Sequence, residues 1–441
     1  MACRHPHTWL LAALAVVSGL PLSGAQVPQA PPPRAKNHSA TELDRLVERL
    51  GSADYRDREA AHAQLRAVGE SALPQLLRAF NNSSPEVSRR ARTLVDALRS
   101  TACPLVRELR ADPAFPIRSV RFSHDGAHVA AGGESGVAVW EVASGRLVRQ
   151  ARCDGSVVAV EFVPKANALW AGGSWSRIDG ISKGGGGTVV RWDWGRERAE
   201  MLAHQMWNTV DDVRLTPGGK HLLAAAGNHV YLLDATTGAR VHAVEVKPYC
   251  VHGLALAADG RRVVAVSPTR TISVIDYQTG RLAQEWNLPP DEQAPPRPQN
   301  PWAGVTGVAA APDGKGYATS VAGSTKGGGG VLFWDTEGKV IQSWQPFTAT
   351  TTHVTYDPSG RFLICGGWDA ARNSGSPPRP PYRAVTVWTV KSGRLVTFME
   401  MEHLDHVTDL AVSEPAGMFA VSQWGVVRLY RFPQPAWGDL P

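Results

Sequence analysis

Seven similar stretches follow one another at intervals of 40 to 56 residues through the C-terminal three-quarters of the chain. Each stretch opens with a short apolar run that leads into a turn sequence containing Gly or Pro. The openings are SVRFSHDG (119–126), AVEFVPKA (159–166), DVRLTPGG (212–219), GLALAADG (253–260), GVAAAPDG (307–314), HVTYDPSG (353–360) and DLAVSEPAG (409–417). Repetition at this period predicts an array of similar supersecondary units rather than a set of unrelated domains.

Each copy carries a later apolar run that ends at a bulky side chain just before another turn. The bulky residues are Trp140, Trp192, Leu233, Ile275, Trp334, Trp388 and Tyr430. Units of this length with four short strands are typical of the blades of a β-propeller. We therefore expect an all-β, seven-bladed β-propeller over residues 101–432, in which the four tryptophans pack between neighbouring blades.

The two ends of the repeat array complement each other. The last copy ends after its third strand, near Phe432, whereas a strand-like segment at 103–111 precedes the first copy. We expect this segment to supply the outer strand of the last blade, because joining the two ends leaves no unpaired sheet edge.

The period, the strand pattern and the pairs Trp192–Asp193 and Trp334–Asp335 resemble those of the WD-repeat (WD40) family. The resemblance extends over about three-quarters of the chain, and it implies a propeller that serves as a scaffold for protein binding. The sequence departs from the family pattern because only two copies keep the Trp-Asp pair and the usual Gly-His pair is missing. The family's His–Ser–Asp hydrogen-bond network is therefore not carried over to this chain.

A small helical module is predicted over residues 41–100, where apolar residues recur at helical spacing from Leu43 onward. Near its end, Ser84 is placed as an N-cap and Pro85 as the first helical residue. The segments 50–77 and 85–98 resemble HEAT repeats, which implies helix pairs that bury their apolar faces by stacking on a neighbouring surface.

The first 25 residues have the pattern of a secretory signal peptide. Arg4 precedes an apolar run at 9–20, and small residues precede the expected cleavage site. We therefore expect an exported protein, located in the periplasm, the cell envelope or outside the cell. Residues 26–40 are predicted to form a Pro-rich linker and residues 433–441 a C-terminal tail. No other stretch is apolar enough to predict a membrane span.

Lys and Arg total 46 against 40 Asp and Glu, and the resulting net charge of +6 is dispersed along the chain. Dispersed charge favours solubility and argues against a nucleic-acid partner. After the signal segment, Cys103, Cys153, Cys250 and Cys365 have the spacing of neither a zinc site nor a small disulfide framework. We expect free thiols, no metal, no cofactor and a monomer.

Long insertions distinguish one face of the predicted propeller from the other. Alternate turns of a four-stranded meander lie at opposite ends of the sheet, and the insertions at 174–187, 288–304, 322–330 and 367–383 all fall at the same end. Loops on a rigid scaffold often carry function, and Trp and Arg are favoured at interfaces. The predicted binding residues on this loop-bearing face are Trp175, Arg177, Trp207, Asp211, Trp302, Trp368, Arg372, His406 and Trp424.

No contiguous catalytic motif is present. The stretch KGGGG occurs at Lys183 and Lys326, but the lysine precedes the glycines and a strand follows, unlike a phosphate-binding loop. The segment HLDH (403–406) connects two strands and lacks further metal ligands. Asp211 and Asp212 are adjacent on a predicted strand, so we expect their side chains to point to opposite sides. No catalytic residue is therefore predicted.

These observations favour an exported, non-enzymatic scaffold that binds a protein or peptide partner through the loop-bearing face. Two alternatives stay open. One is an enzyme of the hydrolase or lyase type with a site in the central channel, and the other is a propeller that binds carbohydrate or cell-envelope material through exposed Trp. A channel enzyme requires His, Asp, Glu or Arg side chains from several blades to converge, whereas a channel mouth of Ala, Val and Gly would argue against it.

Overall fold

The computed structural model describes most of the chain after the predicted signal segment and linker. The described residues are 38–111, 114–174, 177–178, 181–182, 186–196, 198–206, 208–246, 250–268, 271–289, 304–324, 328–347, 350–368, 383–401 and 406–440. Residues 39–441 form one compact unit. Lys183, Lys326 and His403, which the sequence analysis examined, lie outside the described residues.

Helices come first in this unit. They are α1 (Ala40–Arg49), α2 (Tyr55–Val68), α3 (Leu73–Arg78) and α4 (Pro85–Leu98). The predicted start of the last helix is confirmed, because the Ser84 side chain accepts a hydrogen bond from the Val87 N–H and Pro85 is the first helical residue. Among the described residues, no helix is both long enough and apolar enough to cross a bilayer.

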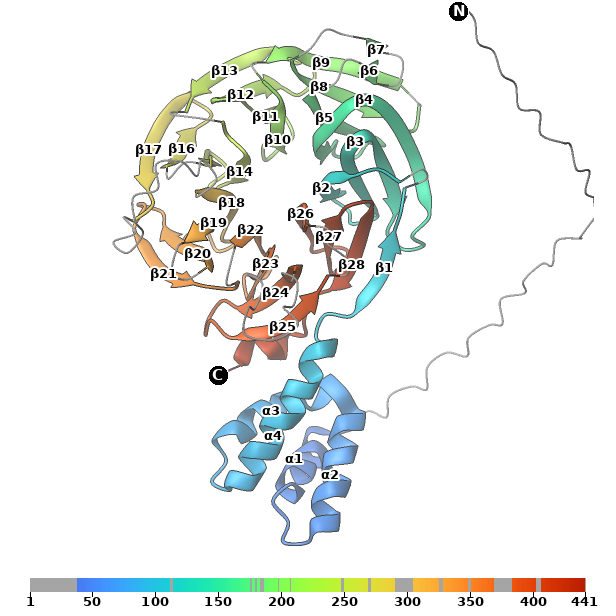
Figure 1. The fold of residues 1–441 in the computed structure, drawn as a ribbon, viewed down its shortest axis with the longest axis vertical. Coiled ribbons are helices and arrows are strands. Elements are labelled where there is room, and N and C mark those ends of the chain that lie inside the picture. Colours follow the sequence, from blue (N-terminus) through green and yellow to red (C-terminus); the bar gives the residue numbers. More distant parts are fainter. Residues whose placement is uncertain are drawn as a thin grey trace, which may run out of the picture. The chain divides into compact units, whose positions relative to one another are not determined.

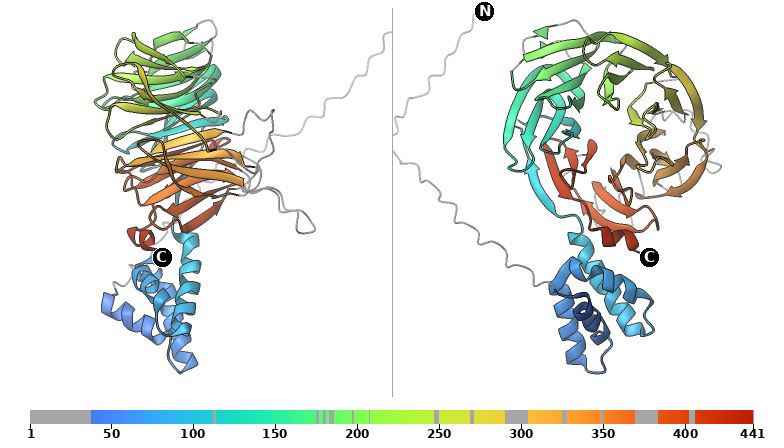
Figure 2. Two further views of the ribbon diagram at one scale, coloured as in Figure 1. Left: turned by 90° about the vertical axis from the view of Figure 1, so that its left-hand side faces the viewer. Right: turned by 180° about the vertical axis from the view of Figure 1, so that it is seen from behind.

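Antiparallel sheets arranged in a ring make up the rest of the unit (Figures 1 and 2). Three sheets in the described part have four strands. Their strands are β10 (Val210–Leu215), β11 (His221–Ala226), β12 (His229–Asp234) and β13 (Arg240–Glu245); β14 (Gly253–Leu256), β15 (Arg262–Val266), β16 (Thr271–Asp276) and β17 (Arg281–Asn287); and β26 (Asp409–Ser413), β27 (Met418–Gln423), β28 (Val426–Arg431) and β1 (Leu105–Leu109).

Two larger sheets in the described part have eight strands each. One contains β18 (Val305–Ala310), β19 (Gly316–Ser324), β20 (Gly328–Asp335), β21 (Val340–Trp344), β22 (Thr350–Tyr356), β23 (Phe362–Trp368), β24 (Arg383–Thr389) and β25 (Leu395–Glu400). The other contains β2 (Ile117–Phe122), β3 (His128–Glu141), β4 (Leu147–Phe162), β5 (Ala168–Ser174), β6 (Arg177–Ile178), β7 (Ile181–Ser182), β8 (Gly187–Asp193) and β9 (Arg198–Met206).

The ring is closed by strands from the two ends of the repeat array. Strand β1 pairs antiparallel with β28, and Leu105 lies opposite Tyr430. The N-terminal segment therefore occupies the outer position of the sheet formed by the last copy, which is the position expected from the sequence. Pairing of this kind removes an open sheet edge.

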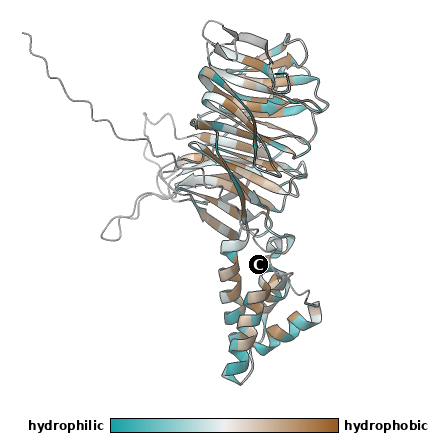
Figure 3. Ribbon diagram, turned by 90° about the vertical axis from the view of Figure 1, so that its right-hand side faces the viewer, coloured by the Kyte–Doolittle hydropathy of each residue, from teal (hydrophilic) through white to brown (hydrophobic). Residues whose placement is uncertain are grey.

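Apolar side chains fill the spaces between successive sheets, and hydrophobic residues recur along the strands and helices (Figure 3). Trp140, Trp192 and Trp334 are buried as predicted. The indole N–H of Trp334 donates to the Thr319 hydroxyl over 2.8 Å. Trp388 is only partly buried, and its ring lies 6.1 Å from that of Trp344. Packing between neighbouring sheets therefore explains Trp140 and Trp334, whereas Trp192 and Trp388 pack within the two eight-stranded sheets.

Neighbouring sheets also meet where a turn of one sheet contacts the outer strand of the preceding sheet. Gly338, in the turn between β20 and β21, has a φ of 90°, and a Cβ built there would lie 2.2 Å from Cδ1 of Trp286 in β17. Gly218 has nearly the same conformation, with a φ of 87°, but its Cβ would meet no atom within 4 Å.

We expect Gly338→Ala to destabilise the fold by about 2–4 kcal/mol, because backbone strain is added to a steric clash. Gly218→Ala is the matched control, since it adds only the strain, and it should cost about 1–2 kcal/mol. Urea unfolding of both variants measures the difference. Equal losses would contradict the contact between Trp286 and the turn.

The C-terminal segment packs against the rest of the unit. Residues Pro435–Asp439 form a short 3₁₀ helix, and Trp437 is completely buried. Its indole N–H donates to Glu70 beside α3 over 3.1 Å, and the Leu440 carbonyl accepts a hydrogen bond from the Ser392 hydroxyl over 2.6 Å. One apolar cluster joins α1–α4, this segment and strands β23–β28, so the segment connects the helices to the ring.

Candidate functional site

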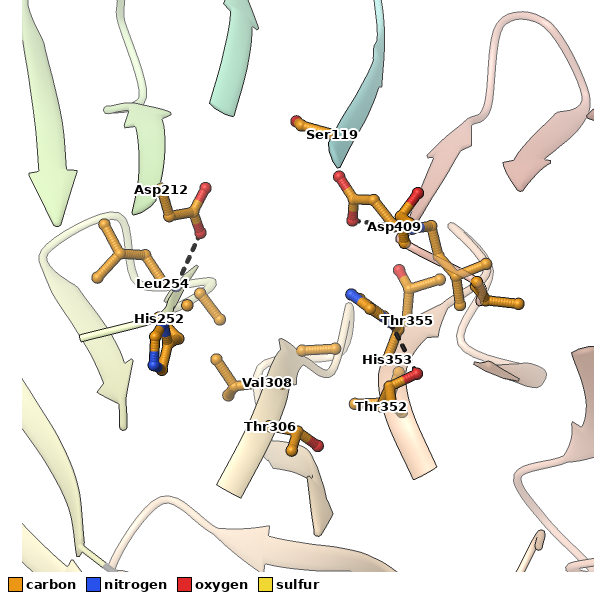
Figure 4. Close-up of a pocket in the computed structure, with 18 of the residues that line it drawn as sticks. Ser119, Asp212, His252, Leu254, Thr306, Val308, Thr352, His353, Thr355 and Asp409 are labelled. Carbon is orange, nitrogen blue, oxygen red and sulfur yellow. Dashed lines mark hydrogen bonds between the residues drawn. The ribbon is translucent and has the colours of Figure 1, made fainter. Parts of the chain in front are cut away.

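A cavity of about 980 Å³ lies at the centre of the ring. It is bordered by the first strand of each repeat, namely β2, β4, β10, β14, β18, β22 and β26. Figure 4 shows labelled side chains from β2, β10, β14, β18, β22 and β26 around the cavity, with Asp212 and Asp409 on opposite sides of it. The cavity is therefore built by residues far apart in the sequence.

The two halves of the cavity wall differ in chemistry. On β14 and β18 the residues facing the cavity include Gly253, Ala255, Gly307 and Ala309, whose small size leaves the space open. The remaining strands contribute a charged group, made up of Arg121 (β2), Asp212 and Arg214 (β10), His353 (β22) and Asp409 (β26). This arrangement differs from a mouth lined only by Ala, Val and Gly.

Asp212 and Asp409, which each precede the apolar residue used to align the repeats, also link neighbouring repeats. The Asp409 carboxylate accepts a hydrogen bond from the Val120 N–H over 3.0 Å, and Asp212 accepts one from the Leu254 N–H over 2.9 Å. Each of these contacts joins the first strand of one repeat to the first strand of the next. The side chains therefore hold the inner strands in register around the cavity.

Ion pairs join the charged residues to one another. Arg121 lies 2.6 Å from Asp409 and 3.6 Å from Asp212, which in turn lies 2.8 Å from Arg214. Burial acts to raise the pKa of Asp409, but Arg121, His353 and the Val120 N–H together bring that pKa below its usual value. Asp409 is therefore ionised at neutral pH and bound to Arg121.

Aromatic and titratable residues lie where the cavity opens on the loop-bearing face. Trp368, at the end of β23, packs against His406 with ring centroids 5.4 Å apart. Trp424, in the turn between β27 and β28, is 54% exposed. Asp211 at the start of β10 and His252 before β14 approach each other at 3.9 Å, from Oδ2 to Nδ1. All five residues border the cavity.

The prediction that Asp211 and Asp212 point to opposite sides is wrong, because both border the same cavity. The pairing of β10 with β11 shifts between Val210 and Asp212, which makes Asp211 the extra residue of a β-bulge. A bulge breaks the alternation of side chains along the strand. Burial raises the pKa of Asp211 to about 7, and the charge of Asp212 adds to the shift.

Comparison with known families agrees with this geometry. Residues 103–141, which include β1, β2 and β3, match the family described as WD domain, G-beta repeat (WD40). The chain contains a WD40 repeat. The match and the ring of sheets confirm the resemblance to the WD40 family. A search of the curated proteins found no match to the chain.

The ring of sheets brings four of the predicted binding residues together at the mouth of the cavity, namely Asp211, Trp368, His406 and Trp424. Arg177 lies on β6, but its side chain is outside the described part. The other four, Trp175, Trp207, Trp302 and Arg372, lie outside the described residues. Within the described part, no three His, Cys, Asp or Glu side chains are grouped as metal ligands.

Sequence reasoning missed the charged residues inside the ring of sheets. Arg121, Arg214 and Asp409 each lie directly beside the apolar residue used to align the repeats. Side chains alternate along a strand, so residues on either side of a core position share the opposite face. Applied to all seven copies, that rule would have placed these residues in the channel.

We expect Asp211→Asn to stabilise the protein above pH 7. The raised pKa of Asp211 means that the folded state holds a proton that the unfolded state releases, so stability falls as pH rises from about 4 to 7. The free energy of unfolding of the variant should therefore exceed that of the wild type by about 2 kcal/mol at pH 8 and should equal it near pH 4. Urea unfolding at both pH values measures this. A gain that does not depend on pH would contradict the burial of an ionisable Asp211.

Proposed function

We propose that this protein is an exported, non-enzymatic scaffold that binds a protein or peptide partner through the loop-bearing face of its WD40 propeller. The observation that carries the proposal is the position of Trp424, Trp368 and His406 around the mouth of the central cavity. Exposed Trp is favoured as an anchor at protein interfaces. Export is inferred from the N-terminal sequence pattern.

We further propose that the ring has seven blades, which would make this face a rigid platform. Strand β4 supports the count because its first part pairs with β3, whereas residues 156–162 pair with β5. A single pairing, Ala322 with Thr350, joins the two halves of the other large sheet. Each eight-stranded sheet is thus consistent with two blades, which gives seven with the three smaller sheets.

A second candidate function, an enzyme of the hydrolase or lyase type, is favoured by the charged side chains that converge in the channel. The ion pairs of Arg121 with Asp409 and of Arg214 with Asp212 weaken this candidate, because they leave those groups bound to one another. A panel of ester, phosphoester and glycoside substrates tests it. Turnover that disappears in His353→Gln, with the fold retained, would establish the enzyme.

The binding proposal is tested with peptides selected from a random library on the immobilised protein. Trp424→Ala should lower the affinity of the selected peptides by about 30-fold, because the variant loses an interface anchor. Ile341→Ala is the matched control, because Ile341 is 63% exposed on the outer strand β21. It should leave affinity unchanged. Equal losses in both variants, or none in Trp424→Ala, would place the binding surface elsewhere.

A further inference from the structure

We propose that the mouth of the cavity binds a cationic side chain, a lysine or arginine of the peptide partner, with Asp211 as its counter-ion. This inference rests on the proposed function and adds the chemistry of the partner. The inference assigns a binding role to Asp211, because the fold itself does not use the charge of this carboxylate.

Asp211 differs from Asp212 and Asp409 in lacking a cationic partner among the described residues. Asp409 is paired with Arg121 and Asp212 with Arg214, and both also accept backbone N–H groups. Within the described part of the chain, Asp211 accepts no hydrogen bond, and its only ion-pair contact is with the His252 ring at 3.9 Å. The side chain of Asp211 is nonetheless only 18% exposed. A carboxylate in this position is available to an incoming cation.

The surroundings of Asp211 suit a long basic side chain. Gly253 follows His252, which lies 3.9 Å from Asp211, and both Gly253 and Gly307 border the cavity and leave room for a chain to enter. Ala255 and Ala309 line the cavity with small apolar side chains, against which the methylene groups of lysine or arginine can pack. Aromatic rings at the rim attract cations through their faces. An anionic side chain would instead meet the unpaired carboxylate, and a neutral one would leave it without a counter-ion.

The arginines that border the cavity already have carboxylate partners, and this favours a cationic over an acidic ligand. Arg118, the remaining arginine that borders the cavity within the described residues, lies 2.6 Å from Glu134. An acidic partner would therefore have to displace an existing carboxylate from Arg118, Arg121 or Arg214. A basic partner displaces nothing and neutralises Asp211.

Binding should strengthen with pH, because the pKa of Asp211 is raised to about 7 by burial and by Asp212. Burial lowers the pKa of His252 and that of His353, which favours the neutral form of both rings. The charged and titratable groups that face Asp211 or the cavity beside it are Arg118 and Arg121 on β2, Glu161 on β4, Asp212 and Arg214 on β10, His252 before β14, His353 on β22, His406 before β26 and Asp409 on β26. His406→Gln separates the contribution of this ring from that of Asp211.

The test uses n-butylguanidinium as the probe, with n-butanol as a neutral analogue and butyrate as an anionic one. Binding to the purified chain is followed by NMR through the indole N–H signals of Trp368 and Trp424. We expect n-butylguanidinium to bind about tenfold more tightly at pH 8 than at pH 6, in proportion to the ionised fraction of Asp211. n-Butanol and butyrate should bind weakly at both pH values.

Asp211→Asn should reduce the affinity for n-butylguanidinium at least tenfold at pH 8 while stabilising the fold, so unfolding cannot explain the loss. Asp313→Asn is the matched control, because Asp313 is an exposed carboxylate in the β18–β19 turn, at the opposite end of the strand from the mouth. Asp313→Asn should leave the affinity for n-butylguanidinium unchanged. Equal binding of all three probes, or unchanged binding in Asp211→Asn, overturns the inference. Peptides that bind through Trp424 without preferring a basic residue would overturn it too, while leaving the proposed function standing.

Discussion

Asp409→Asn is expected to lower the free energy of unfolding by about 3–5 kcal/mol at neutral pH, because it leaves a buried Arg121 without its carboxylate. Asp409 lies 2.6 Å from Arg121 and accepts the Val120 N–H over 3.0 Å. These contacts join the last repeat to the first, where the ring closes. The variant therefore weakens the ring at its closing point, which β1 also spans from the outer edge.

Urea unfolding measures this loss in the free energy of unfolding, and two further variants serve as comparisons. The exposed pair Arg118–Glu134 is the control, since Arg118→Gln should cost less than about 1 kcal/mol. Adding Arg121→Gln to Asp409→Asn should recover part of the stability, because the unpaired charge is removed. The lowered pKa of Asp409 gives stability that is present above about pH 4 and lost as pH falls below it, so the cost should shrink in acid. A cost of under 1 kcal/mol at pH 7 would contradict a closing role.

Trp437→Ala is expected to destabilise the protein by about 3–5 kcal/mol, the cost of emptying a large buried aromatic site. Trp437 is completely buried, and its indole N–H donates to Glu70. The cavity left behind would lie in the cluster that joins the helices to β23–β28. The helices should therefore be released before the ring unfolds.

Limited proteolysis and urea unfolding together test this order. In Trp437→Ala we expect rapid cleavage near residues 99–104, which link α4 to β1, while the ring resists. Trp424→Ala is the control, because Trp424 is 54% exposed and its loss should cost little. Similar stability of the two variants would contradict the account of the C-terminal segment.

Much of the fold could be predicted because each repeat carries the sequence pattern of its own strands and turns. Alternating apolar residues and Gly-containing turns define the strands, and Ser84 with Pro85 defines the start of α4. Trp437 could not be assigned in the same way. It lies outside every repeat, and its partner Glu70 is distant in the sequence, so only the folded chain brings them together.

The candidate site was predictable at its rim but not in its interior. Trp368 and Trp424 stood out because they fall outside the packing pattern on the loop-bearing face. Asp211 was placed on that face, but the β-bulge that turns it towards the cavity has no signal in two adjacent aspartates. The ion pair of Arg121 with Asp409 depends on ring closure, which brings the first and last repeats into contact.

The most direct test of the binding account is hydrogen–deuterium exchange of the protein with and without a selected peptide. The account predicts slower exchange at residues 250–254, 366–368, 406–410 and 423–426, which border the mouth of the cavity or lie next to residues that do. Exchange in the outer strands β13, β17 and β21 should be unchanged. Protection confined to those outer strands or to α1–α4, with none at the mouth, would contradict it.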